Sequence, residues 1–229
     1  MLLRTLEPEV MDSRDDAWDY DSMDHGEVNR RFVEDLLAVA DLPAAGDDED
    51  FDPLLVLDIG AGTAQIPILL CQATEDVRVL AADAAVSMLD LARLNVEIAG
   101  LRERIQLDQS DAKQMPYRNA MFDAVISNSI VHHIPEPREV LREAVRVTRF
   151  GGVLFFRDLK RPADEEEVDR LVETYAEGCN EHQRALFRNS LHAALTIDEL
   201  RAVVAELGFA PETVQVTSDR HWTWCARRA

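Results

Sequence analysis

The feature that most constrains the fold of this chain is a nearly continuous apolar run, residues 54–59, which ends in the turn Gly60-Ala61-Gly62-Thr63. A short apolar run without alternation is typical of a strand buried on both faces of a parallel sheet. A helix is predicted over 64–73, with Pro67 in its first turn, where a missing N–H is harmless. The pattern therefore predicts the strand, turn and helix that open an α/β sheet.

The same alternation continues along the chain. Further strands are predicted at 77–82, 105–107, 122–127 and 153–156, the last after a turn at Gly151-Gly152, with helices at 85–99 and 135–149. Strands that alternate with helices are joined by right-handed crossovers and form a parallel sheet with helices on both faces. After a helix over 196–208, the segments 213–216 and 222–225 predict a closing antiparallel pair in which Trp222 and Trp224 face the core.

The regions outside this pattern are expected to complete a single domain over 1–229. Residues 1–25 lack clear periodicity, a helix is predicted from Glu27 to Ala40 with Asp24 as its cap, and 41–53 has the composition of an acidic linker. Residues 164–195 are predicted to be helical. We expect an N-terminal lid and helix (1–50), a cofactor-binding core (54–158), a helical cap (159–195) and a closing helix and hairpin (196–229).

Charge and composition limit the partners. The formal net charge is −20 and the chain has only two lysines, so its field repels a phosphate backbone, which makes nucleic acid an unfavourable partner. No run approaches the roughly 18 apolar residues of a membrane span, the N-terminus turns acidic too early for a signal peptide, and three scattered cysteines suit a reducing cytoplasm. We expect a cytoplasmic protein with a small-molecule partner, and the sequence leaves its oligomeric state open.

The glycine turn is the first place to look for a ligand, because open parallel sheets bind ligands at the carboxyl ends of their strands. Gly60 permits a tight turn, and Gly62 lets a ligand approach the backbone. The chain lacks the Gly-Lys-Ser/Thr of a phosphate-binding loop, and Gln65 stands where a dinucleotide fingerprint requires Gly or Ala. An ordinary strand–helix turn remains the alternative.

Two carboxylates follow the next strands. Asp83 ends the second strand and can accept hydrogen bonds from ribose hydroxyls, or cap the following helix. Asp111, after the third strand, can accept from an exocyclic adenine amine, or act as a turn residue. Met88 can pack beside a nucleoside or in the core. This set favours a nucleoside ligand without phosphates.

These motifs together resemble the class I S-adenosylmethionine-dependent methyltransferases. The resemblance covers about residues 54–158, and alanine at position 64, where the family usually has glycine, is a mild departure. It is carried by Asp58-x-Gly60-x-Gly62-Thr63, Asp83 with Met88-Leu89, Asp111-Ala112 with Met115-Pro116-Tyr117, Phe122-Asp123-Ala124-Val125, and Ser127 through Ile134. The resemblance implies a Rossmann-like, doubly wound α/β fold with a seven-stranded sheet of order 3-2-1-4-5-7-6 and an antiparallel last strand.

The resemblance also implies S-adenosylmethionine as cofactor. The glycine turn would face its methionine part, Asp83 its ribose, Asp111 and Ala112 its adenine, and Asn128 its amino-acid end. The full set of expected cofactor contacts is Tyr20, Gly60, Ala61, Gly62, Thr63, Asp83, Ala84, Met88, Asp111, Ala112 and Asn128. Tyr20 would act as a lid over the site, and a packing role is its alternative.

The acceptor side of the site is less determined by the sequence. His132 and His133 are candidate general bases if the acceptor must lose a proton, and packing histidines otherwise. Arg157 could bind an acidic or polar substrate, or pair with Asp158 structurally. The remaining histidines form no metal spacing with any cysteine, so no metal site is expected.

The sequence therefore predicts an S-adenosylmethionine-dependent methyltransferase that acts on a small molecule. One alternative is a non-catalytic module that binds the cofactor. Another is an enzyme that uses a modified cofactor, such as a carboxymethyl form whose carboxylate Arg157 would pair with. A nicotinamide-dependent reductase is disfavoured by Gln65.

Overall fold

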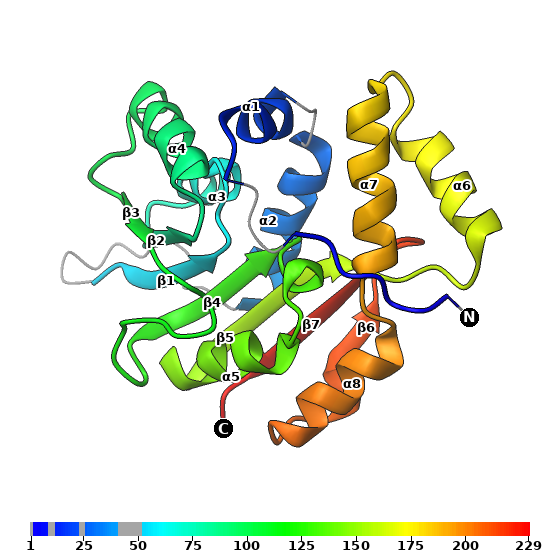
Figure 1. Ribbon diagram of the computed structural model, residues 1–229. Helices are drawn as coiled ribbons and strands as arrows, with labels where there is room; N and C mark the ends of the chain where they lie inside the picture. The colour runs from blue at the N-terminus through cyan, green and yellow to red at the C-terminus, as the bar shows by residue number, and fades with distance from the viewer. Residues whose placement is uncertain (1, 9–11, 23–25, 41–51) are drawn as a thin grey trace.

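A seven-stranded sheet forms the centre of the computed structural model, which describes residues 2–8, 12–22, 26–40 and 52–229 (Figure 1). The strand order is β3-β2-β1-β4-β5-β7-β6, and β7 runs antiparallel to both β5 and β6. The strands are β1 (Leu54–Ile59), β2 (Val77–Asp83), β3 (Ile105–Gln109), β4 (Phe122–Asn128), β5 (Thr148–Leu159), β6 (Val214–Val216) and β7 (His221–Arg227). The predicted order and the antiparallel last strand are confirmed.

Helices cover both faces of the sheet because side chains along each buried strand alternate between the faces. Val56 packs in a cluster with Phe32 and Leu70, whereas its neighbour Leu57 packs in a cluster with Leu141. The first face is covered by α2 (Gly26–Ala40), α3 (Gln65–Ala73) and α4 (Val86–Ile98), and the second by α5 (Pro137–Val147) and α8 (Ile197–Glu206). Trp222 and Trp224 are buried on the second face, as predicted.

Three local features differ from the expectations. Residues 14–22, which lack clear periodicity, form helix α1 (Arg14–Ser22). The fifth strand starts at Thr148, so Gly151 and Gly152 lie inside it; an added Cβ on Gly152 would lie 2.8 Å from the Asp123 carbonyl oxygen, which explains the glycine. The helical cap is two helices, α6 (Glu165–Tyr175) and α7 (Glu181–Ala193), because Gly178 has a φ of +80° between them. The predicted cap Asp24 and residues 41–51 of the linker lie outside the described residues.

The first residues of the chain lie beside elements that come more than 100 residues later. The Leu2 and Thr5 amides donate to the Ala163 and His192 carbonyls. The Arg4 guanidinium donates to the Ala193 carbonyl at 2.7 Å and to the His132 carbonyl at 3.1 Å, which ties this segment to η1 (Val131–His133). The remaining short helix is η2 (Pro211–Thr213). Residues 2–8 therefore lie against η1 and the C-terminal end of α7.

No helix within the described residues is long and apolar enough to cross a membrane.

Candidate active site

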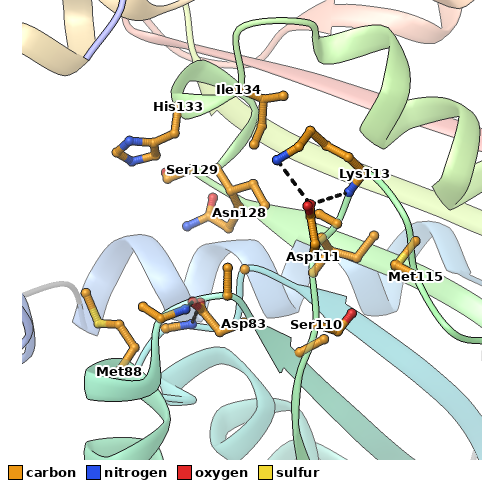
Figure 2. A pocket seen from close by; sticks show the side chains of 18 of the residues that line it. Asp83, Met88, Ser110, Asp111, Lys113, Met115, Asn128, Ser129, His133 and Ile134 are labelled. Carbon is orange, nitrogen blue, oxygen red and sulfur yellow. Dashed lines mark hydrogen bonds and ion pairs between the residues drawn. The ribbon is translucent and has the colours of Figure 1, made fainter. Parts of the chain in front are cut away.

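A cavity opens at the carboxyl ends of β1, β2 and β4, where the order of the strands reverses (Figure 2). This is the position at which open α/β sheets bind their ligands. It is lined by Tyr20, Ile59, Gly60, Gly62, Ala82, Asp83, Ala84, Ala85, Met88, Ser110, Asp111, Ala112, Lys113, Met115, Asn128, Ser129, Ile130, His133 and Ile134. Most of the expected cofactor residues are thus brought together around one cavity.

The glycine turn forms the floor of this cavity. Gly60 has a φ of +70°, and an added Cβ would lie 2.4 Å from the Ile130 side chain, so both conformation and space require glycine there. Gly62 also has a positive φ, of +53°. Ala64 adopts a left-handed conformation as well, with a φ of 64°, where a Cβ is unfavourable. The usual glycine of the family would be unstrained at position 64.

Asp83 connects the glycine turn to the second strand. Its Oδ2 accepts a hydrogen bond from the Gly62 amide at 2.8 Å, and its Oδ1 accepts one from the Ala85 amide at 2.8 Å. Burial raises the pKa of Asp83, and these amides offset part of that effect. The N-cap of α4 is Ala85, so Asp83 holds the turn before the helix and also faces the cavity.

The residues after β3 form a further wall of the cavity (Figure 2). Asp111 accepts hydrogen bonds from Lys113, whose Nζ lies 3.1 Å from Oδ1 and whose amide lies 2.9 Å from it. Burial raises the pKa of Asp111, but the hydrogen bonds from Lys113 outweigh it, and the net shift is downward. Asp111 is therefore held as an ionised acceptor at the rim. Sequence reasoning missed Lys113 and Ser110 as wall residues.

A smaller hollow adjoins the glycine turn on the other side and is lined by Ala61, Thr63, Asp58 and Asn128, among others. The pKa of Asp58 is raised well above its usual range, mainly by burial and secondly by repulsion from the Asp83 carboxylate. The Asn128 Oδ1 is buried and has no hydrogen-bond partner among the described residues. A ligand that brings a cation and a hydrogen-bond donor would satisfy both groups.

An ammonium group has this chemistry, because it is both a cation and a hydrogen-bond donor. Asp58 was part of the motif but not of the expected contacts; an acidic residue inside an apolar strand was the signal that could have identified it.

Tyr20 of α1 lies at the boundary of both hollows, and its ring is 3.6 Å from the position of a Cβ on Gly62. Burial, with the nearby charges of Asp83 and Asp58, raises its pKa to about 12, so its hydroxyl stays protonated. α1 is fixed to α4 through a small cluster that includes Ala17 and Met88. Trp18 points to solvent instead, with 66% of its surface exposed.

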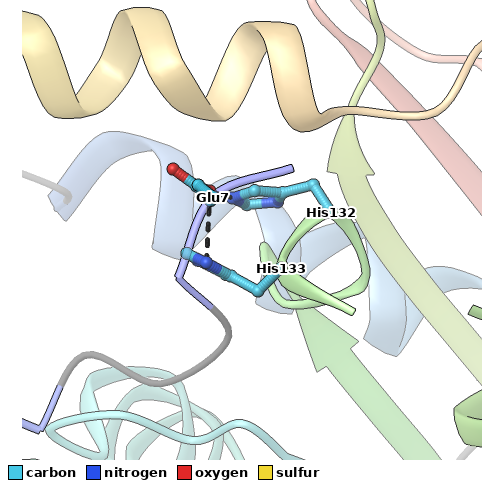
Figure 3. A group of neighbouring side chains, drawn as sticks. All are labelled: Glu7, His132 and His133. Atoms are coloured by element: carbon cyan, nitrogen blue, oxygen red, sulfur yellow. Dashed lines mark ion pairs between the residues drawn. The ribbon is translucent and has the colours of Figure 1, made fainter. Parts of the chain in front are cut away.

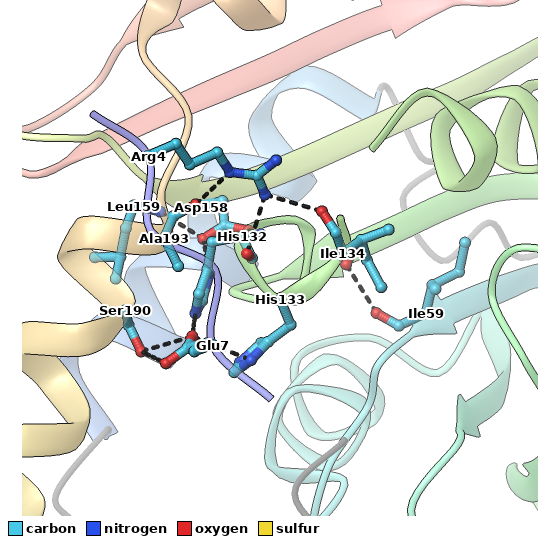
Figure 4. Close-up of polar contacts among 11 residues, drawn as sticks. Arg4, Glu7, Ile59, His132, His133, Ile134, Asp158, Leu159, Ser190 and Ala193 are labelled. Carbon is cyan, nitrogen blue, oxygen red and sulfur yellow. Dashed lines mark hydrogen bonds and ion pairs between the residues drawn. The ribbon is translucent and has the colours of Figure 1, made fainter. Parts of the chain in front are cut away.

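The two histidines after β4 have different surroundings. His133 lines the cavity, whereas His132 is buried behind it and does not (Figure 4). The His132 Nδ1 lies 2.5 Å from Asp158 Oδ1, and its amide donates to Asp158 Oδ2 at 3.0 Å. Burial lowers the pKa of His132, but the Asp158 carboxylate outweighs it and the net shift is upward. Asp158 thus orients His132 and stabilises its charged form.

Glu7 lies between these two histidines (Figure 3). Its Oε1 is 3.3 Å from the Nε2 of His132 and 3.1 Å from the Nδ1 of His133, and the Ser190 hydroxyl donates to Oε1 at 3.2 Å. Burial raises the pKa of Glu7, while burial and the charge of His132 lower the pKa of His133 to about 3. Sequence reasoning missed Glu7, because nothing local marks a residue that meets its partners 125 positions later.

Arg157 does not line the cavity, contrary to the expectation that it binds substrate. Its guanidinium donates to Asp35 at 2.8 Å and to Thr223 at 2.9 Å, and it stacks near the rings of Phe32 and Phe155. Asp158, one residue later, points to the opposite face of the sheet, so the two do not pair. The proposal of a carboxymethyl cofactor was based on Arg157, and its position removes that support.

Comparison with known proteins agrees with this geometry. Residues 57–156 match the family model of a methyltransferase domain. The chain is 28% identical over 217 residues to a 27-O-demethylrifamycin SV methyltransferase from Amycolatopsis mediterranei, an alignment that covers 92% of this chain and 72% of that protein. It is 27% identical to a malonyl-[acyl-carrier protein] O-methyltransferase from Geobacter sulfurreducens, covering 84% of this chain and 66% of the relative.

Solved structures show the same fold. An S-adenosylmethionine-dependent methyltransferase from Aquifex aeolicus superimposes with a TM-score of 0.65 at 17% identity, covering 95% of this chain and 99% of that one. The sheet order, the hydrogen bond from the glycine turn to Asp83, and the match over residues 57–156 agree with one another. Residues 57–156 therefore match a methyltransferase domain, and the described residues have the fold of the class I S-adenosylmethionine-dependent methyltransferases.

Proposed function

We propose that this enzyme transfers the methyl group of S-adenosylmethionine to an oxygen of a small-molecule acceptor. When bound, the cofactor supplies an electrophilic methyl group on a sulfonium, and the protein contributes position and electrostatics. The observation that carries the proposal is His133, which lines the cavity on the side opposite Asp83 and Met88 (Figure 2), with Glu7 beside it and His132, held by Asp158, behind it.

The nucleoside of the cofactor is proposed to lie in the main cavity, and its amino-acid part in the smaller hollow beside the glycine turn. Asp83 would accept from the ribose hydroxyls while it keeps the Gly62 amide, because each carboxylate oxygen has two acceptor positions. Asp111 would accept from the adenine amine, beside Ala112 and Met88. Asn128 and Asp58 would take the ammonium group. Tyr20 would cover the cofactor as a lid.

The acceptor half is proposed to lie against η1 and the N-terminal segment. His133 reaches the cavity, and His132 stands behind it with a carboxylate on each ring nitrogen. Such a centre would activate a hydroxyl by passing its proton through His133 toward the Glu7 carboxylate, or by holding an ion that lowers the pKa of the hydroxyl. Either role makes the acceptor oxygen a better nucleophile for an in-line displacement.

Three further observations support a small acceptor with a reactive oxygen. The names of the two relatives above describe methylation of a 27-O-demethylrifamycin and O-methylation of a malonyl group carried on an acyl-carrier protein. The net charge of −20 disfavours a nucleic acid. The wall near His133 includes the apolar side chains of Ile130 and Ile134, which suit an uncharged organic molecule.

The proposal is tested in two steps. Calorimetry with S-adenosylmethionine and S-adenosylhomocysteine should show binding that Asp83→Asn weakens by about tenfold or more, as the loss of a charged hydrogen-bond acceptor requires. Asp90→Asn, an exposed aspartate of α4, is the matched control and should bind normally. Transfer of a labelled methyl group is then screened against hydroxylated small molecules, RNA and protein. Labelling of RNA or protein alone would contradict the proposed acceptor class.

A further inference from the structure

We propose that Glu7, His132 and His133 form a binding site for one divalent transition-metal ion, with Zn²⁺ as the best match, at the acceptor end of the cavity. Among the described residues, this group offers one oxygen and two ring nitrogens that all lie within 4.8 Å of one another (Figure 3). Two histidines and one glutamate are a ligand set found in catalytic zinc sites, which keep a fourth position open.

The two distances from Glu7 to the histidines match such a site. The Glu7 Oε1 lies 3.3 Å from one ring nitrogen and 3.1 Å from the other. With metal–ligand bonds of the usual length, adjacent ligands of a tetrahedral zinc ion are about 3.3 Å apart. The His133 Nδ1 is buried and makes no hydrogen bond among the described residues, although it lies close to Glu7. A nitrogen in this position has a lone pair available for a cation.

The surroundings of the three ligands also fit. The Nδ1 of His132 bonds to Asp158, which leaves Nε2 as the ligand atom; metal-bound histidines commonly have such a carboxylate on the other nitrogen. The Ser190 hydroxyl, from α7, supports the Glu7 carboxylate in the same way (Figure 4). The positive charge of Arg4 acts against a cation beside His132, whereas the carboxylates of Asp158 and Glu7 favour one.

The open position would face the acceptor, because His133 is the member of the group that lines the cavity. The use of the ion in catalysis rests on the proposed methyl transfer, whereas its binding does not. An acceptor hydroxyl bound to the ion would release its proton to water. The oxygen would then form a bond to the methyl carbon as the carbon–sulfur bond breaks, and that electron pair would stay on sulfur.

The test uses full-length protein without a histidine tag, stripped with a chelator and titrated with ZnCl₂ in a calorimeter. Millimolar Mg²⁺ in the buffer saturates non-specific acidic sites on a chain of this charge. We expect one zinc ion per chain, with affinity reduced at least about tenfold by Glu7→Gln and by His133→Ala. The control is His182→Ala, an exposed histidine of α7, which should bind as the unaltered chain does.

A second measurement keeps the inference testable if a variant does not fold. Cobalt added to the stripped, unaltered chain should give the visible spectrum of a tetrahedral nitrogen and oxygen site, without a sulfur charge-transfer band. Absence of a zinc site, unchanged affinity in folded Glu7→Gln and His133→Ala, or a sulfur band would overturn the inference. S-adenosylmethionine is titrated into the same stripped protein, and its failure to bind would count against the proposed function instead.

Discussion

The two ends of the cavity are built in different ways. The cofactor end comes from consecutive strand ends, where Gly60, Gly62 and Asp83 are fixed by the turns that follow β1 and β2. The acceptor end is assembled from four distant pieces: the N-terminal segment, η1, the end of β5 and α7. A local motif is sufficient for the first, whereas the second depends on how the whole chain packs. A local motif of this kind can recur in many chains that bind the same cofactor. An acceptor end that depends on the packing of the whole chain can differ from one chain to the next.

The largest effect is expected for a substitution at the acceptor end, which should slow methyl transfer without weakening cofactor binding. Asp158→Asn removes the carboxylate that orients His132, and we expect the rate of methyl transfer to fall about 100-fold or more. S-adenosylmethionine affinity should stay within about twofold, because Asp158 does not line the cavity. Single-turnover kinetics and calorimetry on folded protein measure the two quantities. An equal loss in both would show that the two ends do not act separately.

The second prediction concerns the glycine turn. Gly60 and Gly100 both have a φ of +70°, but only Gly60 is crowded, by Ile130. Gly100→Ala should lower the free energy of unfolding by about 1 kcal/mol, from backbone strain alone. Gly60→Ala adds overpacking, for a total of about 3 kcal/mol or more. Denaturant unfolding measures both, and equal losses would mean that the turn is not packed as described.

The third prediction concerns pH. Burial raises the pKa of both Asp83 and Asp58 above the ordinary range of aspartate. Each group therefore takes up a proton at a higher pH than an ordinary aspartate does, and protonation removes an acceptor for the ribose and a partner for the ammonium. Cofactor affinity should therefore decrease on acidification from neutral pH to about pH 5. Calorimetry should show a weaker dependence in Asp58→Asn, and tighter binding in acid would contradict this electrostatic account.

The smallest effect is expected at Ala64. Glycine there relieves a left-handed backbone, worth about 1 kcal/mol. It also removes a buried methyl group, at a cost of about 0.8 kcal/mol. The free energy of unfolding of Ala64→Gly should thus change by less than about 1 kcal/mol, and cofactor affinity should be retained. A large loss in thermal or denaturant unfolding would show that the methyl group has a packing role beyond its area.

Much of the fold could be predicted because its signals are local. Continuous apolar runs mark the central strands, and the glycine turn marks the carboxyl edge where the ligand lies. The break between α6 and α7 also had a local signal, Gly178 followed by the cap Asn180 with Gln183 three residues later. Helix α1 had none, because it is held by contacts with α4 rather than by its own apolar pattern.

The candidate site divides in the same way. The cavity contains the cofactor residues that follow strands, such as Asp83 and Asp111. Arg157 also lies near the carboxyl end of its strand. Because side chains alternate between the two faces along β5, it points to the face covered by α2, where it pairs with Asp35. Glu7 could not be predicted, since its position depends on a tertiary contact with η1 and α7.

The central claim is that an adenosyl group lies across the glycine turn with its sulfur directed toward the histidines. The most direct measurement is a crystal structure of the protein with S-adenosylhomocysteine. The account predicts the ribose hydroxyls on Asp83, the adenine beside Asp111 and the sulfur facing His133. A nucleoside bound elsewhere, or an adenine placed against the histidine pair, would contradict it.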